Sequence, residues 1–557
     1  MNTQVESKRV QLRWRPVDHQ ALAEVKELLG DEPKRRDLLI EHLHKIQDRY
    51  HHISAAHIVA LASLMGLATT EVYEVATFYH HFDVVKEGET PPPSLTVRVC
   101  DSITCEMFGA RKLIDDLKER LDPNVRVQHV PCVGRCQSAP VAVVGTHPID
   151  NATPETVHQA IAAGQIEAVP APYIHYPLYR KQGGYKTFLA CVHGELDAET
   201  VMKKLEDSKL RGLGGAGFPA GRKWRILRGQ PKPRLIAINI DEGEPGTFKD
   251  RYYLERDPHR FLEGALIAAW ATEAEAIYIY LRDEYAGCRE ILNEELKALE
   301  ANPPCPIPPI HLRRGAGAYI CGEESAMVES IEGKRGMPRL RPPAGFYLAN
   351  VGLFGRPTLE HNMETLYWVR DILEKGPEWF TSHGRHGRVG LRSYSVSGRV
   401  RKPGVHLAPA GITMRELIDE YCGGMLPGHE FYGYFPGGAS GGILPTSLGD
   451  IPLDFDMLQP YGAFIGSAAV VVFSQQDKAK TLALNAMRFF EDESCGQCTP
   501  CRVGTAKAVK LMEQERWDQA LLEELAQTMV DASICGLGQA APNPLRCAMK
   551  YFPEEFE

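Results

Sequence analysis

The stretch RLIAINIDEGEPGTFKDR, residues 234–251, decides the fold of the largest part of this chain. RLIAIN predicts a strand, and the helical stretch FLEGALIAAWATEA (261–274) and the strand AIYIYL (276–281) follow in the order of a parallel sheet. Asp241, Glu242 and Glu244 come where the first strand ends, and ligands of α/β sheets gather at the carboxyl ends of strands. Carboxylates there can accept hydrogen bonds from ribose hydroxyls or an amide; a solvated acidic loop is the alternative.

A glycine-rich segment, RGLGGAGFPAGRKW (211–224), precedes this stretch. Gly212, Gly214 and Gly217 satisfy GxGxxG, but the preceding TVMKKLEDSKL predicts a helix, whereas the ordinary dinucleotide fingerprint needs a strand there. Glycines still allow backbone amides to approach a phosphate, which Arg222 or Lys223 could neutralise. A turn without a ligand remains open as the alternative.

The segment GAGAYICGEESAM (315–327) repeats the same chemistry. Its small residues permit close approach to a ligand, and the paired carboxylates Glu323 and Glu324 follow them. Two such loops in one domain favour a ligand site over coincidence.

The 557 residues predict several domains, because one hydrophobic core stops growing well below this length. Helical spacing, strand patterns and turn residues set the boundaries. We expect a helical bundle at 1–90, a βαβ-type unit at 94–165, a linker at 166–194, an α/β domain at 195–392, a small α+β module at 393–475 and a helical domain at 476–557.

The net charge of −9 gives no sign of the basic surface that nucleic-acid binding requires. The first residues lack the apolar core of a signal peptide, and the most apolar stretch, 464–473, is too short to span a bilayer. We therefore expect a cytoplasmic protein without membrane insertion. Since thiols stay reduced in the cytosol, the clustered ones among the 14 cysteines point to metal ligation instead of disulfides.

The densest cysteine cluster, Cys495, Cys498 and Cys501, forms CxxCxxC, and Cys535 follows a helical stretch later. Three thiolates in one tight loop and a distant fourth are the ligands that a [4Fe-4S] cluster requires. Structural zinc is the alternative, although it usually draws on two separated CxxC pairs.

Two looser pairs, Cys100 with Cys105 and Cys132 with Cys136, each follow a predicted strand. Side by side, their loops would offer two thiolates to each iron of a [2Fe-2S] cluster, and zinc is a stronger rival here because it often takes four cysteines. The default for the unpaired cysteines is a buried or inert thiol; they are Cys191, Cys288, Cys305, Cys321, Cys422 and Cys547.

Together with HNMETL (361–366) and ESCGQCTPCRVGT (493–505), these segments resemble the flavin-bearing, NADH-oxidising subunit of respiratory complex I. The first 165 residues resemble the thioredoxin-like [2Fe-2S] partner of that subunit. The resemblance implies a fusion of the two, as a multidomain α/β protein with a thioredoxin-like domain, a Rossmann-like FMN- and NAD(H)-binding domain, a ubiquitin-like α+β domain and a helical iron-sulfur bundle.

The resemblance also implies site residues. Phe218, Glu244 and Glu324 match positions that receive the nicotinamide nucleotide, and Glu244 and Glu324 take the catalytic role. The positions implied for the cofactors besides these are Gly212, Gly214, Gly215, Gly217, Lys223, Asn239, Asp241, Glu242, Tyr319, Gly322, Glu323, Arg341, Asn362 and Thr365.

Several matched positions depart from the family pattern, mostly on the nucleotide side. Ile226 and Ala344 replace aromatic residues, which weakens the case for an adenine stacked in the usual way. Arg341 replaces a common lysine and can still meet phosphate through its planar fork. His361 replaces the first of two asparagines beside the flavin.

By resemblance, we expect the chain to be the diaphorase (beta) subunit of a cytosolic NAD-dependent formate dehydrogenase. Hydride would pass between NAD(H) and FMN, and single electrons through the clusters to or from a catalytic partner that holds further clusters and a molybdenum or tungsten site. The alternatives are the diaphorase of an NAD-reducing hydrogenase, a complex I-like subunit, a redox-responsive scaffold and a zinc-bearing assembly protein.

Overall fold

The computed structural model describes residues 16–340 and 347–557. Arg341 and Ala344 therefore lie outside the described residues. The chain divides into two compact units, Met1–Pro92 and Pro93–Glu557.

The first unit is a bundle of helices, as the apolar spacing of its sequence predicts. The side chains of Asp18 and Ser54 cap two of the helices by accepting from backbone N–H groups. A short parallel strand pair, β1 (Ile53–Ser54) and β2 (Val84–Val85), closes the unit. The helices are α1 (His19–Leu29), α2 (Leu39–Tyr50), α3 (Ala55–Met65) and α4 (Thr69–Phe78).

The second unit begins with a thioredoxin-like domain built on a four-stranded sheet of order β4-β3-β5-β6. The βαβ pattern expected from the sequence forms β3, α6 and β4, in which β3 and β4 run parallel, and β5 and β6 add antiparallel strands. The elements are β3 (Leu95–Cys100), α5 (Ile103–Met107), α6 (Ala110–Arg120), β4 (Val125–Val130), β5 (Ala142–Val144), β6 (His147–Ile149) and α7 (Pro154–Ala162).

Two short helices follow within the segment expected to be a linker, α8 (Tyr176–Lys181) and α9 (Lys186–Val192). Their tyrosines are buried in the core of the next domain. The carboxylate of Glu263 accepts from the hydroxyl of Tyr179 at 2.6 Å and from the backbone N–H of Tyr185 at 2.8 Å. The segment is thereby packed against the α/β domain.

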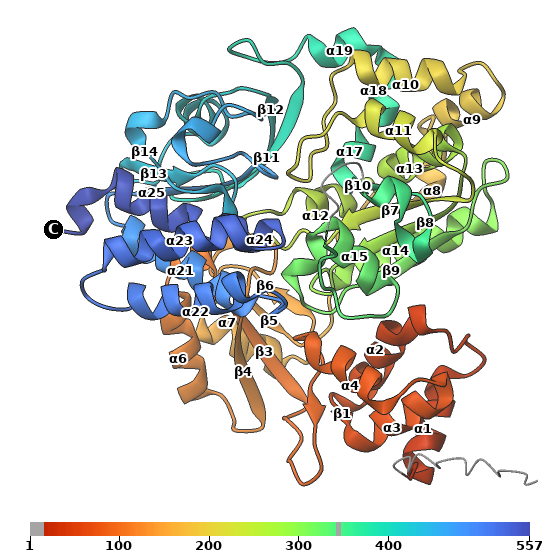
Figure 1. The fold of residues 1–557 in the computed structure, drawn as a ribbon, viewed down its shortest axis with the longest axis horizontal. Helices are drawn as coiled ribbons and strands as arrows, with labels where there is room; N and C mark the ends of the chain where they lie inside the picture. Colours follow the sequence, from red (N-terminus) through yellow and green to blue (C-terminus); the bar gives the residue numbers. More distant parts are fainter. Residues whose placement is uncertain (1–15, 341–346) are drawn as a thin grey trace, which may run out of the picture. The chain divides into compact units, whose positions relative to one another are not determined.

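The α/β domain holds a four-stranded, fully parallel sheet of order β10-β7-β8-β9, as the strand and helix order predicts. Helix α13 packs against β7 and β8, and α14 against β9, in the arrangement that Figure 1 shows. The elements are α10 (Ala198–Asp207), α11 (Ala220–Arg228), β7 (Arg234–Ile240), α12 (Lys249–Leu254), α13 (Pro258–Thr272), β8 (Ala274–Leu281), α14 (Ala286–Ala301), β9 (Ile310–Arg314), η3 (Tyr319–Gly322), α15 (Glu324–Ile331), α16 (Tyr347–Asn350), β10 (Thr358–Asn362), α17 (Met363–Tyr367), α18 (Val369–Lys375) and α19 (Pro377–Thr381).

The next module has the ubiquitin-like strand order β12-β11-β15-β13-β14, with the central β15 parallel to β11. Most of the central strand β15 comes from the apolar stretch 464–473. The elements are β11 (Leu391–Gly398), β12 (Gly404–Pro409), α20 (Met414–Glu416), a π-helical turn (Leu417–Tyr421), β13 (Phe431–Phe435), β14 (Leu444–Pro445) and β15 (Ala469–Ser474).

The chain ends in a helical domain that packs beside the ubiquitin-like module, with α25 against β14 (Figure 1). Among the described residues, no helix is both long and apolar enough to cross a membrane. The helices are α21 (Ala479–Asp492), α22 (Thr499–Met512), α23 (Gln519–Ala532), α24 (Gly536–Ala540) and α25 (Asn543–Tyr551).

Candidate functional site

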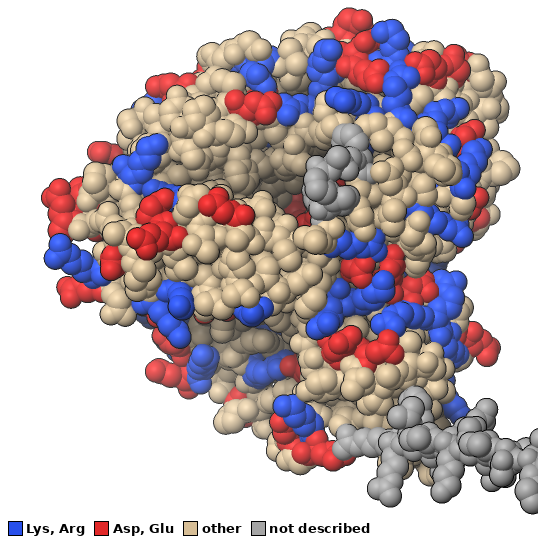
Figure 2. Space-filling model, in the orientation of Figure 1, with Lys and Arg blue, Asp and Glu red and all other residues tan. Residues whose placement is uncertain are grey.

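One cavity of about 630 Å³ brings most of the predicted cofactor residues together. The surface drawn in Figure 2 is hollowed where the ubiquitin-like module meets the α/β domain. The walls come from the loops that end β7 and β10, the loop between α10 and α11, the η3 turn, the ubiquitin-like module and the start of α24. The predicted residues that line it are Gly212, Gly214, Gly215, Gly217, Phe218, Lys223, Asn239, Asp241, Glu242, Glu244, Tyr319, Gly322, Glu323, Glu324 and Asn362.

Three other described positions from the sequence analysis, Thr365, Ile226 and Arg222, do not line the cavity. Thr365 is buried beneath it, where its hydroxyl accepts from the backbone N–H of Leu213 at 2.9 Å. Thr365 thus holds the glycine-rich loop in place from below. Ile226 lies on α11 and does not line the cavity.

The glycine-rich loop follows helix α10 and has no strand before it, so it is not an ordinary dinucleotide fingerprint. A Cβ at Gly214 would fall 2.9 Å from the Cβ of Asn362. Gly215 has a φ of +136°, and a Cβ there would have no neighbour closer than 3.9 Å. The loop therefore needs glycine for conformation at one position and for space at another, which leaves its backbone open to a ligand.

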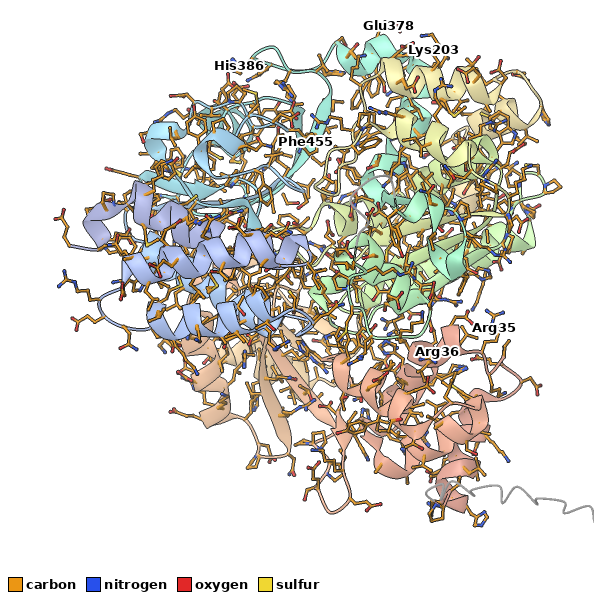
Figure 3. The ribbon with its side chains drawn as sticks, viewed as in Figure 1. Arg35, Arg36, Lys203, Glu378, His386 and Phe455 are labelled. Atoms are coloured by element: carbon orange, nitrogen blue, oxygen red, sulfur yellow. The ribbon has the colours of Figure 1, made fainter. Side chains whose placement is uncertain are left out.

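Phe455 of the ubiquitin-like module fixes the other side of this loop (Figure 3). A Cβ at Gly217 would lie 2.6 Å from the Phe455 ring, and the guanidinium groups of Arg211 and Arg392 lie 4.5 and 4.0 Å from the ring centroid. Arg211 also forms an ion pair with Asp456 at 2.6 Å. The module thus clamps the loop through one aromatic ring and its flanking cations.

The acidic loop after β7 is only partly exposed to solvent: Asp241 is buried, and Glu242 and Glu244 are half-buried at the cavity wall. Burial raises the pKa of Asp241 well above its usual range. Burial and then the charge of Asp250 raise the pKa of Glu242 to about 7. The Glu242 carboxylate accepts from the backbone N–H groups of Asp250 and Arg251 at 2.7 and 3.1 Å and from the hydroxyl of Tyr285 at 2.7 Å. This carboxylate is therefore a structural anchor of the loop.

Glu244 joins three parts of the chain at the cavity wall. One carboxylate oxygen accepts from the backbone N–H and the hydroxyl of Ser440 at 2.8 and 2.9 Å, and the other accepts from the hydroxyl of Tyr319. The backbone N–H of Tyr319 donates to Glu493, next to the CxxCxxC loop, at 2.8 Å. Burial raises the pKa of Glu244, against the opposing effect of these hydrogen bonds.

Glu323 and Glu324, the paired carboxylates of the segment 315–327, have different positions. Glu323 caps α15, since one of its oxygens accepts from the backbone N–H groups of Ser325 and Ala326, both at 2.9 Å. Glu324 is the first residue of that helix and lines the cavity.

Charged and polar side chains at the end of β10 also line the cavity. Lys223 pairs with Glu360 at 2.8 Å. The indole N–H of Trp224 donates to Nε2 of His361 at 2.7 Å, and burial, followed by the charge of Lys223, lowers the pKa of His361 well below its usual range. His361 is therefore a neutral acceptor.

A buried lysine lies beneath the acidic loop and was not predicted. The Lys249 ammonium contacts Asp250 at 2.8 Å, Asn362 at 3.1 Å and Glu364 at 3.1 Å. Lysine is almost never fully buried unless it is paired, and nothing in the segment GTFKDR distinguishes it from a surface lysine. The carboxylates around it raise its pKa against desolvation.

The ubiquitin-like module contributes further wall residues that the sequence analysis missed. They follow β13 and precede β15, in glycine-rich text (FPGGASGG and FIGS) that could have signalled close backbone approach. These residues are Gly437, Ser440, Phe464, Gly466 and Ser467.

The cysteines of the CxxCxxC loop meet the distant fourth one. Cys495, Cys498, Cys501 and Cys535 line one small pocket at the starts of α22 and α24. Burial raises the pKa of Cys501 to about 11 and of Cys535 to about 12, so thiolates there need a metal to stabilise them. This pocket and the large cavity share a wall, made by Ile320, Ile534, Cys535 and Leu537.

The four cysteines of the thioredoxin-like domain also converge. The Sγ atoms of Cys132 and Cys136 lie 3.2 Å apart. Hydrogen bonds of the Cys100 thiol with Cys105 and then Cys132 raise its pKa, which places the two pairs in contact. All four are buried, so the loops after β3 and β4 form one enclosed set of thiols.

Family models match three stretches of the chain: the Nuo51 FMN-binding domain at 205–371, the thioredoxin-like [2Fe-2S] ferredoxin at 25–165, and the NADH-ubiquinone oxidoreductase-F iron-sulfur binding region at 481–557. The chain is 41% identical over 393 residues to the NADH-quinone oxidoreductase F 2 subunit of Rhizobium meliloti, covering 68% of this chain and 92% of that protein. The corresponding F subunit of Aquifex aeolicus is 39% identical over 402 residues, covering 68% and 90%. The chain belongs to the family of NADH-quinone oxidoreductase F subunits.

A solved chain of an NAD⁺-reducing [NiFe]-hydrogenase in the H₂-reduced state matches with a TM-score of 0.82 and 30% identity, covering 94% of both chains. The likeness spans the thioredoxin-like domain as well as the part shared with the F subunits. The chain is thus an NADH-binding electron-transfer subunit, with FMN, NAD(H), [2Fe-2S] and [4Fe-4S] as its cofactors.

The geometry of this family member fits those groups. Gly212 and Gly215 leave room where a side chain would project into the cavity, as close approach of a flavin phosphate requires. The four cysteines of the thioredoxin-like domain are all buried, and the other four line one small pocket with Cys501 buried and the rest half-buried. Four thiols in one place are the donor set of [2Fe-2S] and [4Fe-4S] ligation.

Proposed function

We propose that this chain is the diaphorase subunit of a cytoplasmic NAD-dependent formate dehydrogenase. It would exchange hydride between NAD(H) and FMN and pass single electrons through its clusters to or from a catalytic partner. The observation that carries the electron-transfer part is the wall that the large cavity shares with the [4Fe-4S] cysteines, including Cys535 itself. No intervening domain separates the two sites.

The cofactors supply the bond making, and bound FMN supplies the exchange between a two-electron donor and one-electron acceptors. The residues of the chain bind and orient. The glycine-rich loop presents backbone amides to phosphate, and Lys223 adds positive charge beside it. This chemistry requires no side chain as a nucleophile.

For the nicotinamide nucleotide we propose Phe218, Glu244 and Glu324, which line the same cavity. Glu244 is held by Tyr319 and Ser440, so its position is fixed before a ligand arrives. Glu244 and Glu324 would orient the nicotinamide ring while the walls exclude water. Acidic side chains in these loops favour NAD over NADP, because a 2′-phosphate would meet negative charge.

The partner would hold the formate site, with a molybdenum or tungsten centre and further iron-sulfur clusters. Affinity purification of the chain from its native cells, followed by assays of formate-dependent and hydrogen-dependent reduction of NAD, tests this assignment. A complex that oxidises formate supports it. A complex without formate activity contradicts it.

A second function is favoured by one observation, the match over 94% of both chains to the hydrogenase chain. On this reading the partner would carry a hydrogen-oxidising site, and the same purified complex would reduce NAD with hydrogen instead of formate. A complex I-like role is the third reading, supported by the identity to the Rhizobium meliloti protein. Reduction of a quinone by the purified complex would support that reading.

A further inference from the structure

Two buried arginines of the α/β domain hold the loop that carries Cys132 and Cys136. Arg251 donates to the backbone oxygen of Gly134 at 2.8 Å, and Arg282 donates to that of Cys132 at 2.7 Å. Both arginines are almost completely buried. The [2Fe-2S] loop therefore rests on two guanidinium groups from a different domain.

The guanidinium of Arg282 has a second link, to the acidic loop. Arg282 follows β8, and besides the Cys132 oxygen its guanidinium donates to the backbone oxygen of Glu242 at 2.8 Å. One cation thus bridges the cluster loop and the acidic loop of the large cavity. Its charge is offset by Glu284, whose carboxylate oxygens lie 2.9 and 3.2 Å from the guanidinium nitrogens.

We infer that Arg282 is a positioning residue that raises the reduction potential of the [2Fe-2S] cluster and that Glu284 opposes it. Reduction adds an electron to a cluster already held by four thiolates. A buried cation one hydrogen bond from a ligand residue stabilises that added charge, because water cannot screen it there. Glu284, bonded to the same guanidinium, stabilises the oxidised cluster instead.

The inference therefore predicts midpoint shifts of opposite sign for variants of the two residues. Structural damage alone would not produce opposite shifts. In Arg282→Gln, the reduced-to-oxidised ratio of the [2Fe-2S] cluster at a fixed solution potential should fall by about tenfold or more, a midpoint lower by about 59 mV. In Glu284→Gln, which keeps a hydrogen-bond acceptor for Arg282, the ratio should rise by about threefold or more on the same relation.

The measurement is an EPR-monitored anaerobic redox titration of the purified holo-chain, with iron content as the check on assembly. Arg111→Gln is the matched control, since that guanidinium is half exposed and pairs with Glu106 beside Cys105. Water screens an exposed charge, so its removal should leave the midpoint near that of the wild type.

Midpoints that move in the same direction in both variants, or that stay at the wild-type value, would overturn the inference. Should Arg282→Gln fail to assemble the cluster, the direction of the Glu284→Gln shift decides alone. The result is independent of the proposed formate partner, because the potential is measured on this chain.

Discussion

At the scale of single residues, Glu244 carries the most specific prediction. Its carboxylate connects the acidic loop to Tyr319 and Ser440 at the cavity wall. Glu244→Gln keeps the shape and removes the charge, and charged hydrogen bonds are worth about 1.5–3 kcal/mol. We expect the apparent KM for NADH to rise by about tenfold or more, as that energy implies.

The flavin content of purified Glu244→Gln should equal that of the wild type, because the proposed role is on the nucleotide and not on FMN. Steady-state kinetics with an artificial dye acceptor and flavin absorbance after purification provide both measurements. Loss of FMN with an unchanged KM would place the residue on the flavin instead.

His361 gives a pH prediction at the same scale. Its folded pKa lies below the ordinary value of 6.5, because the ring is buried and Lys223 is near. As pH falls, the unfolded chain takes up this proton first, so stability is complete above pH 6.5 and is lost progressively below it.

His361→Asn keeps an acceptor for Trp224 and removes the titrating group. The variant should lose less stability than the wild type between about pH 6.5 and 5, the window below the ordinary histidine pKa. Thermal unfolding followed by flavin release reports on the domains that form the cavity. Identical pH slopes for the two proteins would show that His361 does not titrate on unfolding.

At the scale of elements, the Phe455 ring links the ubiquitin-like module to the glycine-rich loop. Phe455→Ala should cost about 3–5 kcal/mol in the free energy of unfolding of the joined domains, as large-to-small core changes do. It should also weaken FMN retention, because the loop loses its support at Gly217.

Phe455→Leu is the control, since it keeps most of the volume and loses only the contacts between the ring and the cations. Flavin dissociation on dilution, measured by recovery of flavin fluorescence, separates the two effects. Equal FMN retention in Phe455→Ala and the wild type would show that Phe455 does not support the glycine-rich loop.

The strands and helices of the α/β domain could be predicted because their apolar residues are continuous and their turns are short. RLIAIN and AIYIYL form neighbouring parallel strands, and the acidic loop lies at the carboxyl end of the first. The spacings of the cysteines likewise predicted two groups of four thiols. The strands and the cysteine spacings depend on neighbours in sequence.

The contributions that sequence patterns could not reveal come from tertiary contact. The wall residues of the ubiquitin-like module, such as Ser440, reach the cavity across some 200 residues of chain. The burial of Lys249 depends on Glu364 and Asn362, which no local pattern links to it.

At the scale of the whole molecule, the flavin cavity and the [4Fe-4S] site should be separable by mutation. Cys501→Ala removes one proposed ligand of the [4Fe-4S] cluster, and Cys501 does not line the large cavity. We expect the variant to retain FMN and its reduction by NADH and to lose the [4Fe-4S] EPR signal. Transfer from NADH to a one-electron acceptor should slow greatly.

The [2Fe-2S] signal of Cys501→Ala serves as the internal control, because its ligands lie in another domain. A variant that keeps full one-electron transfer would show that electrons leave by a path other than the shared wall.

The central claim is that one chain takes electrons from NADH at the large cavity and passes them through the adjoining cysteine-bound cluster. Anaerobic stopped-flow mixing of NADH with the purified holo-chain tests it most directly. The account predicts that flavin absorbance bleaches first and iron-sulfur absorbance follows in the same reaction. An iron- and FMN-loaded chain whose flavin stays oxidised with NADH would contradict it.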